Sequence, residues 1–136
     1  MSVDFDLHMK VAFHDLDPLQ VVWHGNYLKY FDVARFGLFA AHGIDLHAYL
    51  MEKHIAFPVT RTSLKHISPL RAFDEFLCRA TVTEAHYKIG MSFEIRKMDS
   101  GILCTRGKSE QLAVRYPEME MEFTIPEDIR QALQWV

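Results

Sequence analysis

Two aspartates that lie close together near the N-terminus are the first candidates for chemistry. Asp15 and Asp17 flank Leu16, and Pro18 follows them, so a turn is predicted here, because proline fixes its own φ and keeps the preceding residue out of the helical region. A carboxylate in a loop can act as a nucleophile or general base if it faces a cleft. Asp17 is therefore the candidate catalytic carboxylate. The alternative is an Asx-turn or helix-capping aspartate, and Asp15 is interpreted as a turn residue.

A His-Gly-Asn sequence follows at the start of a predicted helix. Because the first N–H groups of a helix have no partner within the helix, those of His24, Gly25 and Asn26 are candidates to stabilise a developing oxyanion. Glycine at position 25 would permit close approach of a substrate. The His24 side chain is either a general base, since histidine changes charge near neutral pH, or a structural residue.

Other catalytic chemistries lack their motifs. The eight histidines include no HExxH or His-x-His pair, so no metal site is predicted. The chain has no GxSxG motif, and neither of its two cysteines has a supporting pattern. Its six glycines form no phosphate-binding loop. Arg61, Arg71, His86 and Lys88 could meet an anionic ligand, although basic residues at strand ends are more often solvated.

A long helix must position the candidate site. Apolar residues recur at three- and four-residue spacing from Tyr27 to Ala41, and most other positions there are apolar too, which predicts a helix buried on nearly all sides. Asn26 is the predicted N-cap, and Gly43 ends the helix. The one polar stripe, whose side chains can pair along the helix, consists of Lys29, Asp32 and Arg35.

The remaining periodicity is mostly that of strands. Alternating patterns predict strands at residues 3–13, 59–67, 75–86, 88–98 and 102–114, with a short helix at 47–53 and a terminal helix from Pro126. Short connections favour antiparallel neighbours. These elements predict an α+β fold in which a curled antiparallel sheet of about five strands wraps around the long helix. An edge strand of that sheet would be exposed, and a dimer that extends the sheet would cover it.

Composition narrows the class of protein. The 136 residues predict a single domain, 1–136, and a net charge of -3 argues against nucleic acid as the main partner. Cys78 and Cys104 are interpreted as reduced, buried thiols of a cytoplasmic protein. The first ten residues resemble neither a signal peptide nor an anchor, and no apolar run is long enough to predict a membrane span.

The central stretch resembles the hot-dog-fold acyl-CoA thioesterases, in particular the 4-hydroxybenzoyl-CoA thioesterase type and its Tol-Pal-associated relatives. The resemblance covers most of the chain. The residues that carry it are Asp15-Leu16-Asp17-Pro18, Val22-Trp23-His24-Gly25-Asn26-Tyr27 and Asp32-Val33-Ala34-Arg35, with Ser68-Pro69-Leu70-Arg71-Ala72-Phe73-Asp74 and Ile125-Pro126-Glu127 further on. One departure is Leu19-Gln20, where many relatives carry a small residue and glycine.

This resemblance implies a hot-dog fold and hydrolysis of an acyl-CoA thioester without a metal or redox cofactor. Asp17 matches the catalytic carboxylate, as nucleophile or as base for a water, and the backbone N–H of His24 matches the group that polarises the carbonyl. Lys88 matches a region that meets the nucleotide phosphates, and Arg71 is a looser match. The implied assembly is a homodimer or homotetramer with the acyl site between subunits. The implied substrate-binding residues are Trp23, Asn26, Tyr27, Lys88 and Arg71.

Two alternative functions are consistent with the same residues. The first is a hydratase or dehydratase on the same fold, which would depend on a side-chain acid or base such as His24 more than on Asp17. The second is a non-catalytic module that binds acyl-CoA or an acyl-carrier protein and releases no product. The aromatic residues near the helix start are compatible with aromatic or medium aliphatic acyl groups, and with simple core packing.

Overall fold

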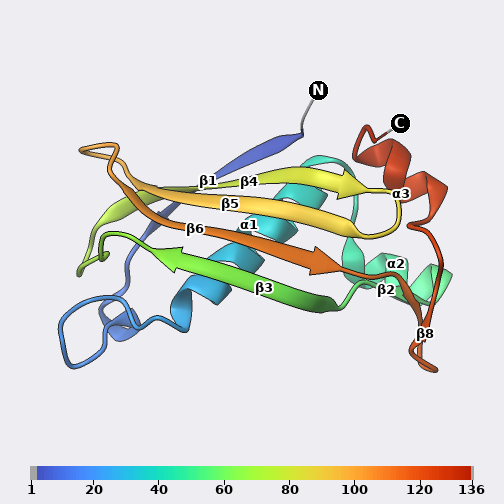
Figure 1. Ribbon diagram of the computed structural model, residues 1–136, viewed down its shortest axis with the longest axis horizontal. Helices are drawn as coiled ribbons and strands as arrows, with labels where there is room; N and C mark the ends of the chain where they lie inside the picture. The colour runs from blue at the N-terminus through green and yellow to red at the C-terminus, as the bar shows by residue number, and fades with distance from the viewer. Residues whose placement is uncertain (1–2, 136) are drawn as a thin grey trace.

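The long helix α1 spans Asn26–Ala41 and lies across one face of a curved sheet (Figure 1). The structure is a computed structural model that describes residues 3–135. The helix occupies the predicted range. Its sheet-facing side chains form the centre of the core and include Tyr27, Tyr30, Phe31, Ala34, Leu38 and Phe39.

Five antiparallel strands form the main sheet, in the order β1-β4-β5-β6-β3. Their bounds are β1 Asp4–Lys10, β3 Val59–His66, β4 Glu75–Ala85, β5 Ile89–Lys97 and β6 Leu103–Gln111. The predicted curled sheet around a central helix is confirmed. The predicted alternation also holds. In β4, for example, Phe76, Cys78 and Ala80 are buried against the helix.

Shorter helices and strands lie at one end of the main sheet (Figure 1). Helix α2 spans Leu46–Lys53 and α3 spans Glu127–Ala132, close to their predicted positions. A second, small sheet is formed by β2 Ile55–Ala56, β7 Val114–Arg115 and β8 Glu120–Met121. This small sheet was not predicted, because strands of two residues are too short to show a period.

The expectation that α1 is buried on nearly all sides is wrong. Leu28, Val33 and Phe36 are exposed, because the sheet covers only one side of the helix. The predicted N-cap is also wrong. Gly25 is the N-cap, and Asn26 is the first helical residue.

The predicted pairing along the polar stripe of α1 is confirmed for two of its three residues. Arg35 is buried, and its guanidinium pairs with Asp32 and donates a hydrogen bond to the Ser109 hydroxyl at 2.9 Å. Lys29 turns away from Asp32 and pairs instead with Asp15. Asp32 and Arg35 therefore pair along the helix as their spacing predicted, whereas Lys29 does not take part in this pairing.

The first strand is shorter than the predicted 3–13. It ends at Lys10, and residues Phe13–Asp15 form a 3-10 turn, η1, in which the Asp15 amide donates to the Ala12 carbonyl at 2.9 Å. The turn rotates the chain out of the strand, so Phe13 is exposed instead of facing the core.

Both cysteines are buried and unpaired, as predicted. Burial, with a smaller contribution from Asp6, raises the pKa of the Cys78 thiol to about 12. Within residues 3–135, no helix combines the length and the apolar character needed to cross a membrane.

Candidate active site

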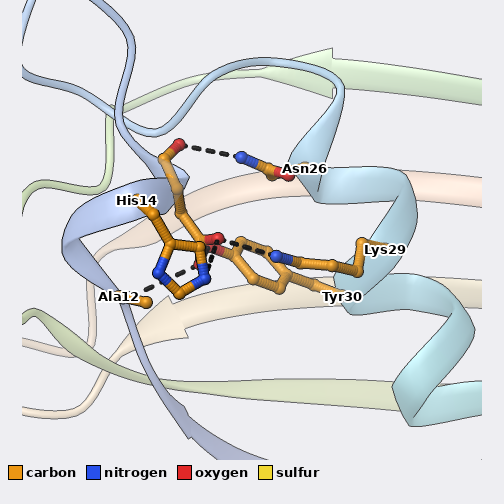
Figure 2. Close-up of polar contacts among 6 residues, drawn as sticks. Ala12, His14, Asn26, Lys29 and Tyr30 are labelled. Carbon is orange, nitrogen blue, oxygen red and sulfur yellow. Dashed lines mark hydrogen bonds and ion pairs between the residues drawn. The ribbon is translucent and has the colours of Figure 1, made fainter.

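The loop before α1 is held in place by the carboxylate of Asp15. This buried carboxylate accepts hydrogen bonds from Lys29 Nζ at 2.7 Å and from the Tyr30 hydroxyl at 2.8 Å, both on α1 (Figure 2). Burial alone would raise the pKa of Asp15, but these two donors outweigh it and hold that pKa below its ordinary value. Burial and the bond to Asp15 raise the pKa of Tyr30, which therefore stays a neutral donor. Asp15 thus fixes the loop to the helix.

The backbone of the same residue joins the two ends of the loop. The Asp15 carbonyl accepts hydrogen bonds from the side-chain amide of Asn26 at 2.8 Å and from the backbone N–H of Trp23 at 2.9 Å. The Asn26 side chain was expected to cap the helix or to bind substrate. In the structure it binds the loop backbone instead of capping the helix.

Asp17 lies at the tip of this loop in a tight turn. Leu16 and Val22 pair across the turn, and the Asp17 amide donates to the Val21 carbonyl at 2.8 Å. One Asp17 carboxylate oxygen accepts from the Leu19 amide at 2.8 Å, which is the Asx-turn geometry. The other carboxylate oxygen has no hydrogen-bond partner within residues 3–135, so Asp17 can be a turn residue and still offer an oxygen for chemistry.

The turn opens onto a cavity of 260 Å³ beside the start of α1. The loop and the helix contribute one wall, and the end of β3 with the turn after it contributes the other. The lining residues are Asp17, Val21, Val22, His24, Tyr27, His66, Ile67, Ser68 and Pro69. The structure therefore brings together three residues predicted from the sequence: Asp17, His24 and Tyr27.

Free backbone N–H groups lie next to this cavity. The amide of Asn26 donates to the Trp23 carbonyl at 2.9 Å, but those of His24 and Gly25 donate to no acceptor within the described range 3–135. The predicted close approach of a substrate at Gly25 stays a prediction, and the structure adds a second reason for glycine at this position. A Cβ there would overlap the ring of Trp23, so glycine makes room for that ring.

Two predicted basic residues have different positions. Arg71 lies beside the loop, because it pairs with Val21 across a short bridge. Lys88 lies at the opposite end of the sheet, where β5 begins, and pairs with Glu110 at 2.9 Å (Figure 1). His66 pairs with Thr105, whereas Ile89, next to Lys88, pairs with Gln111, six residues further along β6. That spacing corresponds to about 20 Å. Lys88 therefore does not line the cavity of its own chain.

Residues on the far wall of the cavity were not singled out as candidates from the sequence. His66 is the last residue of β3, and its ring centroid lies 4.8 Å from that of Tyr27. The amides of Ile67 and Ser68 both donate to the Cys104 carbonyl, which anchors the turn after the strand. Two sequence signals were present here, the Ser68-Pro69 strand end and the family resemblance of residues 68–74, but neither shows which residues the strand end faces.

A larger hollow of 510 Å³ lies at the other end of α1. Its lining is largely apolar, with Phe36, Phe39, Ile44 and Leu46, and it does not include Asp17. The smaller cavity is the better candidate active site, because it combines a carboxylate, free N–H groups and histidines. Among residues 3–135, no three side chains of His, Cys, Asp or Glu cluster as a metal would require.

Comparison with solved structures shows the fold. A 1,4-dihydroxy-2-naphthoyl-CoA thioesterase from Synechocystis superimposes with a TM-score of 0.86 at 20% identity, covering 96% of each chain. A mutant 4-hydroxybenzoyl-CoA thioesterase, in complex with 4-hydroxybenzoyl-CoA, gives a TM-score of 0.87 at 15% identity over 96% of this chain and 99% of that one. The predicted hot-dog fold is therefore confirmed.

Sequence comparison gives the family. A putative esterase from Synechocystis is 25% identical over 111 residues, which are 81% of this chain, and the chain spans 66% of the length of that relative. The sequence model of the thioesterase-like superfamily matches residues 11–133. The predicted class of enzyme, a thioester hydrolase, is confirmed at the level of this family. The match begins just after β1 and extends past the end of α3, so the chain belongs to the thioesterase-like superfamily.

Proposed function

We propose that the protein is an acyl-CoA thioesterase whose active site is the cavity beside Asp17. The observation that carries this proposal is that a partly exposed carboxylate and His24, whose backbone N–H is unpaired within residues 3–135, border the same small cavity, with the unpaired N–H of Gly25 next to them in the chain. Thioester hydrolysis needs these two kinds of group. A thioester carbonyl is activated and its thiolate departs readily, so one carboxylate and one preorganised donor can suffice.

Asp17 supplies the carboxylate. Its bond from the Leu19 amide fixes the orientation of the side chain and leaves the other oxygen available. This oxygen attacks the carbonyl carbon directly, or it takes a proton from a water that attacks. The geometry is compatible with both routes. Direct attack expels the thiolate and forms an acyl anhydride on Asp17, which water then hydrolyses, whereas the base route adds hydroxide to the carbonyl carbon and then expels the thiolate. Each route passes through a tetrahedral intermediate with a negative oxygen and ends with the same products, a carboxylic acid and free coenzyme A.

The backbone amides of His24 and Gly25 supply the electrostatic stabilisation of the tetrahedral intermediate. They precede a helix of 16 residues, whose aligned peptide dipoles place partial positive charge at this end. In the tetrahedral intermediate the carbonyl oxygen becomes negative, and N–H groups that are already oriented toward it stabilise that charge without reorganisation. Removal of such a donor typically costs about 10²–10³ in turnover.

Neighbouring residues would place the substrate. Tyr27 lines the cavity and is buried, and burial raises the pKa of its hydroxyl. Trp23 is half exposed, with its ring over Gly25, so it offers an apolar surface at the rim. Asn26 acts through the loop that it holds, and Arg71 beside the loop is available for an anionic part of coenzyme A.

A homodimer through β3 would complete the site. β3 is an edge strand, seven of its eight residues are exposed, and an unpaired strand edge favours pairing with a copy of itself. Antiparallel pairing about a twofold axis would bring the end of the sheet that carries Lys88 in one protomer toward the Asp17 cavity of its partner. That arrangement supports the prediction that Lys88 meets the nucleotide phosphates. The acyl-carrier protein as an alternative thiol carrier, a tetramer and a cytoplasmic location stay predictions.

The experiment is a thiol-release assay against a panel of aromatic and aliphatic acyl-CoAs. We expect Asp17→Asn to lower turnover on the order of a hundredfold or more while the protein stays folded. Asp99→Asn, the same chemical change in the exposed β5–β6 turn, is the matched control and should retain turnover. Full activity of Asp17→Asn would refute the assignment.

The same panel separates the two alternative functions. A hydratase or dehydratase would release no thiol and would lose more activity on replacement of His24 than of Asp17. A binding module would hold acyl-CoA tightly, as measured by calorimetry, and would form no product with any member of the panel.

A further inference from the structure

The cavity beside Asp17 is also lined by a histidine that the reaction described above does not use. His66 is the last residue of β3, and its backbone position is set by pairing with Thr105 and by the anchored turn that follows. Its ring lies against Tyr27 and borders the same 260 Å³ cavity as Asp17. A rigid strand end therefore holds an imidazole at the candidate active site.

The ring nitrogens of His66 are not engaged by other residues of the described range 3–135. The residue is exposed, and neither ring nitrogen has a hydrogen bond or ion pair within residues 3–135. Asp17, Tyr27 and His24, which also line the cavity, have other roles or other contacts. Asp17 is the proposed nucleophile or base. The Tyr27 hydroxyl accepts a bond from the Leu70 amide at 3.4 Å, and burial raises its pKa, which makes it a poor acid. The ring of His24 packs against Trp23 on the same wall as Asp17.

The dimensions of the cavity place the thioester group between the two walls. A volume of 260 Å³ holds a thioester and a few flanking atoms, whereas the acyl group and the coenzyme A arm must extend outside it. The carboxylate on one wall approaches the carbonyl carbon. The sulfur that leaves is then held in the same cavity, whose lining includes His66.

We propose that His66 is a further catalytic residue, the general acid that protonates the departing sulfur. This inference rests on the proposed thioesterase function. When the tetrahedral intermediate collapses, the carbon–sulfur bond breaks and its electron pair goes to sulfur. The proton on a ring nitrogen of the imidazolium passes to the sulfur, so that a free thiol leaves and neutral imidazole remains. Solvent then returns a proton to the imidazole, and the acyl carbon keeps the oxygen delivered by the nucleophile.

The test compares two leaving groups on the same acid. One substrate is the acyl-CoA with the highest turnover in the panel, and the other is the 4-nitrothiophenyl ester of that acid, whose thiolate leaves without a proton. A general acid contributes typically about 10²–10⁴, and less where the leaving group departs readily. We therefore expect His66→Gln to lower kcat/KM for the acyl-CoA roughly tenfold to a hundredfold. The same variant should leave kcat/KM for the nitrothiophenyl ester within about twofold of wild type.

The outcomes are distinct from those that test the proposed function. Equal losses on both esters, or no loss on the acyl-CoA, would refute the role of His66, since a residue that only shapes the cavity affects both substrates alike. Absence of thiol release by the wild-type protein would refute the thioesterase itself. His66→Asn provides a second variant if His66→Gln does not fold. His8→Gln, on β1 and paired with Glu75, is the matched histidine control and should keep both rates.

Discussion

Asp15 and Asp17 are two residues apart, but substitution with asparagine should lower mainly the stability of the protein at Asp15 and mainly its turnover at Asp17. Asp15 is buried and accepts hydrogen bonds from Lys29 and Tyr30, whereas Asp17 borders the cavity. Asp15→Asn removes the charge but retains nearly the same volume and one acceptor oxygen. We expect this variant to lose stability, with turnover lowered only as far as the loop becomes mobile.

The expected loss of stability follows from the two side chains that donate hydrogen bonds to Asp15. The Lys29 side chain is 48% exposed, so its ion pair contributes at most about 1 kcal/mol. The Tyr30 hydroxyl is buried, and a buried donor that loses its partner costs about 1–3 kcal/mol. Asparagine has no charge, so the ion pair with Lys29 is lost, and its single acceptor oxygen cannot fully satisfy both donors. The two losses together should lower the free energy of unfolding by about 2–3 kcal/mol. For a chain of this length that corresponds to a fall in Tm of about 10 °C.

The assay is urea denaturation of wild type and Asp15→Asn at a fixed protein concentration and several pH values. The pKa of Asp15 is lowered in the folded state, so the ionised form contributes stability above the pKa of about 4 that the carboxyl has in the unfolded chain. That contribution is lost as the pH falls through the lower, folded-state pKa. The difference between the two proteins should therefore be full above about pH 5 and shrink toward zero below about pH 4.

Asp17→Asn is the matched control for this measurement. Asparagine retains the oxygen that accepts from the Leu19 amide, so the unfolding midpoint should change little while turnover collapses. The reasoning would be refuted if Asp15→Asn were as stable as wild type at neutral pH. A stability difference that stayed constant down to pH 3 would refute the assignment of the effect to the ionised carboxylate.

Two further predictions concern the loop and the assembly. Gln20 has a φ of 65°, in the left-handed region that glycine adopts without strain, so Gln20→Gly should raise the free energy of unfolding by about 0.5–1 kcal/mol; an unchanged or lower urea midpoint would contradict this. The exposed β3 edge predicts a dimer, so light scattering should give about twice the chain mass of 15.9 kDa, and a monomer at micromolar concentration would contradict the proposed assembly.

The hydrophobic periodicity of the sequence predicted most of the fold. The alternation in Glu75–Ala85 and Ile89–Lys97 predicted both strands and the faces that they bury, because successive side chains of a strand point to opposite sides. The helix at Asn26–Ala41 was predicted for the same kind of reason. The errors lie where local pattern and tertiary surroundings differ. An apolar helix surface does not reveal that the sheet covers only one side, and Phe13 continued the strand pattern into a turn.

The sequence predicted only part of the candidate site. Asp17 and His24 are seven residues apart, and proline and glycine signals mark the turn and helix start that hold them, so local rules could place them near each other. His66 is more than 40 residues further on, and nothing in its neighbours indicates that β3 ends at this cavity. The order of the strands in the sheet decides that contact.

The sequence by itself determined the long helix, the strands of the main sheet with the faces that they bury, and the loop that presents Asp17, because these depend on the preferences of residues near one another in the chain. Only the tertiary structure decided which of two similar aspartates is buried under Lys29 and Tyr30 and which faces the cavity. It also decided that Lys88 lies at the far end of the sheet and that His66 borders the same cavity as Asp17. These outcomes depend on strand order and register, which bring distant segments together and leave no period in the sequence.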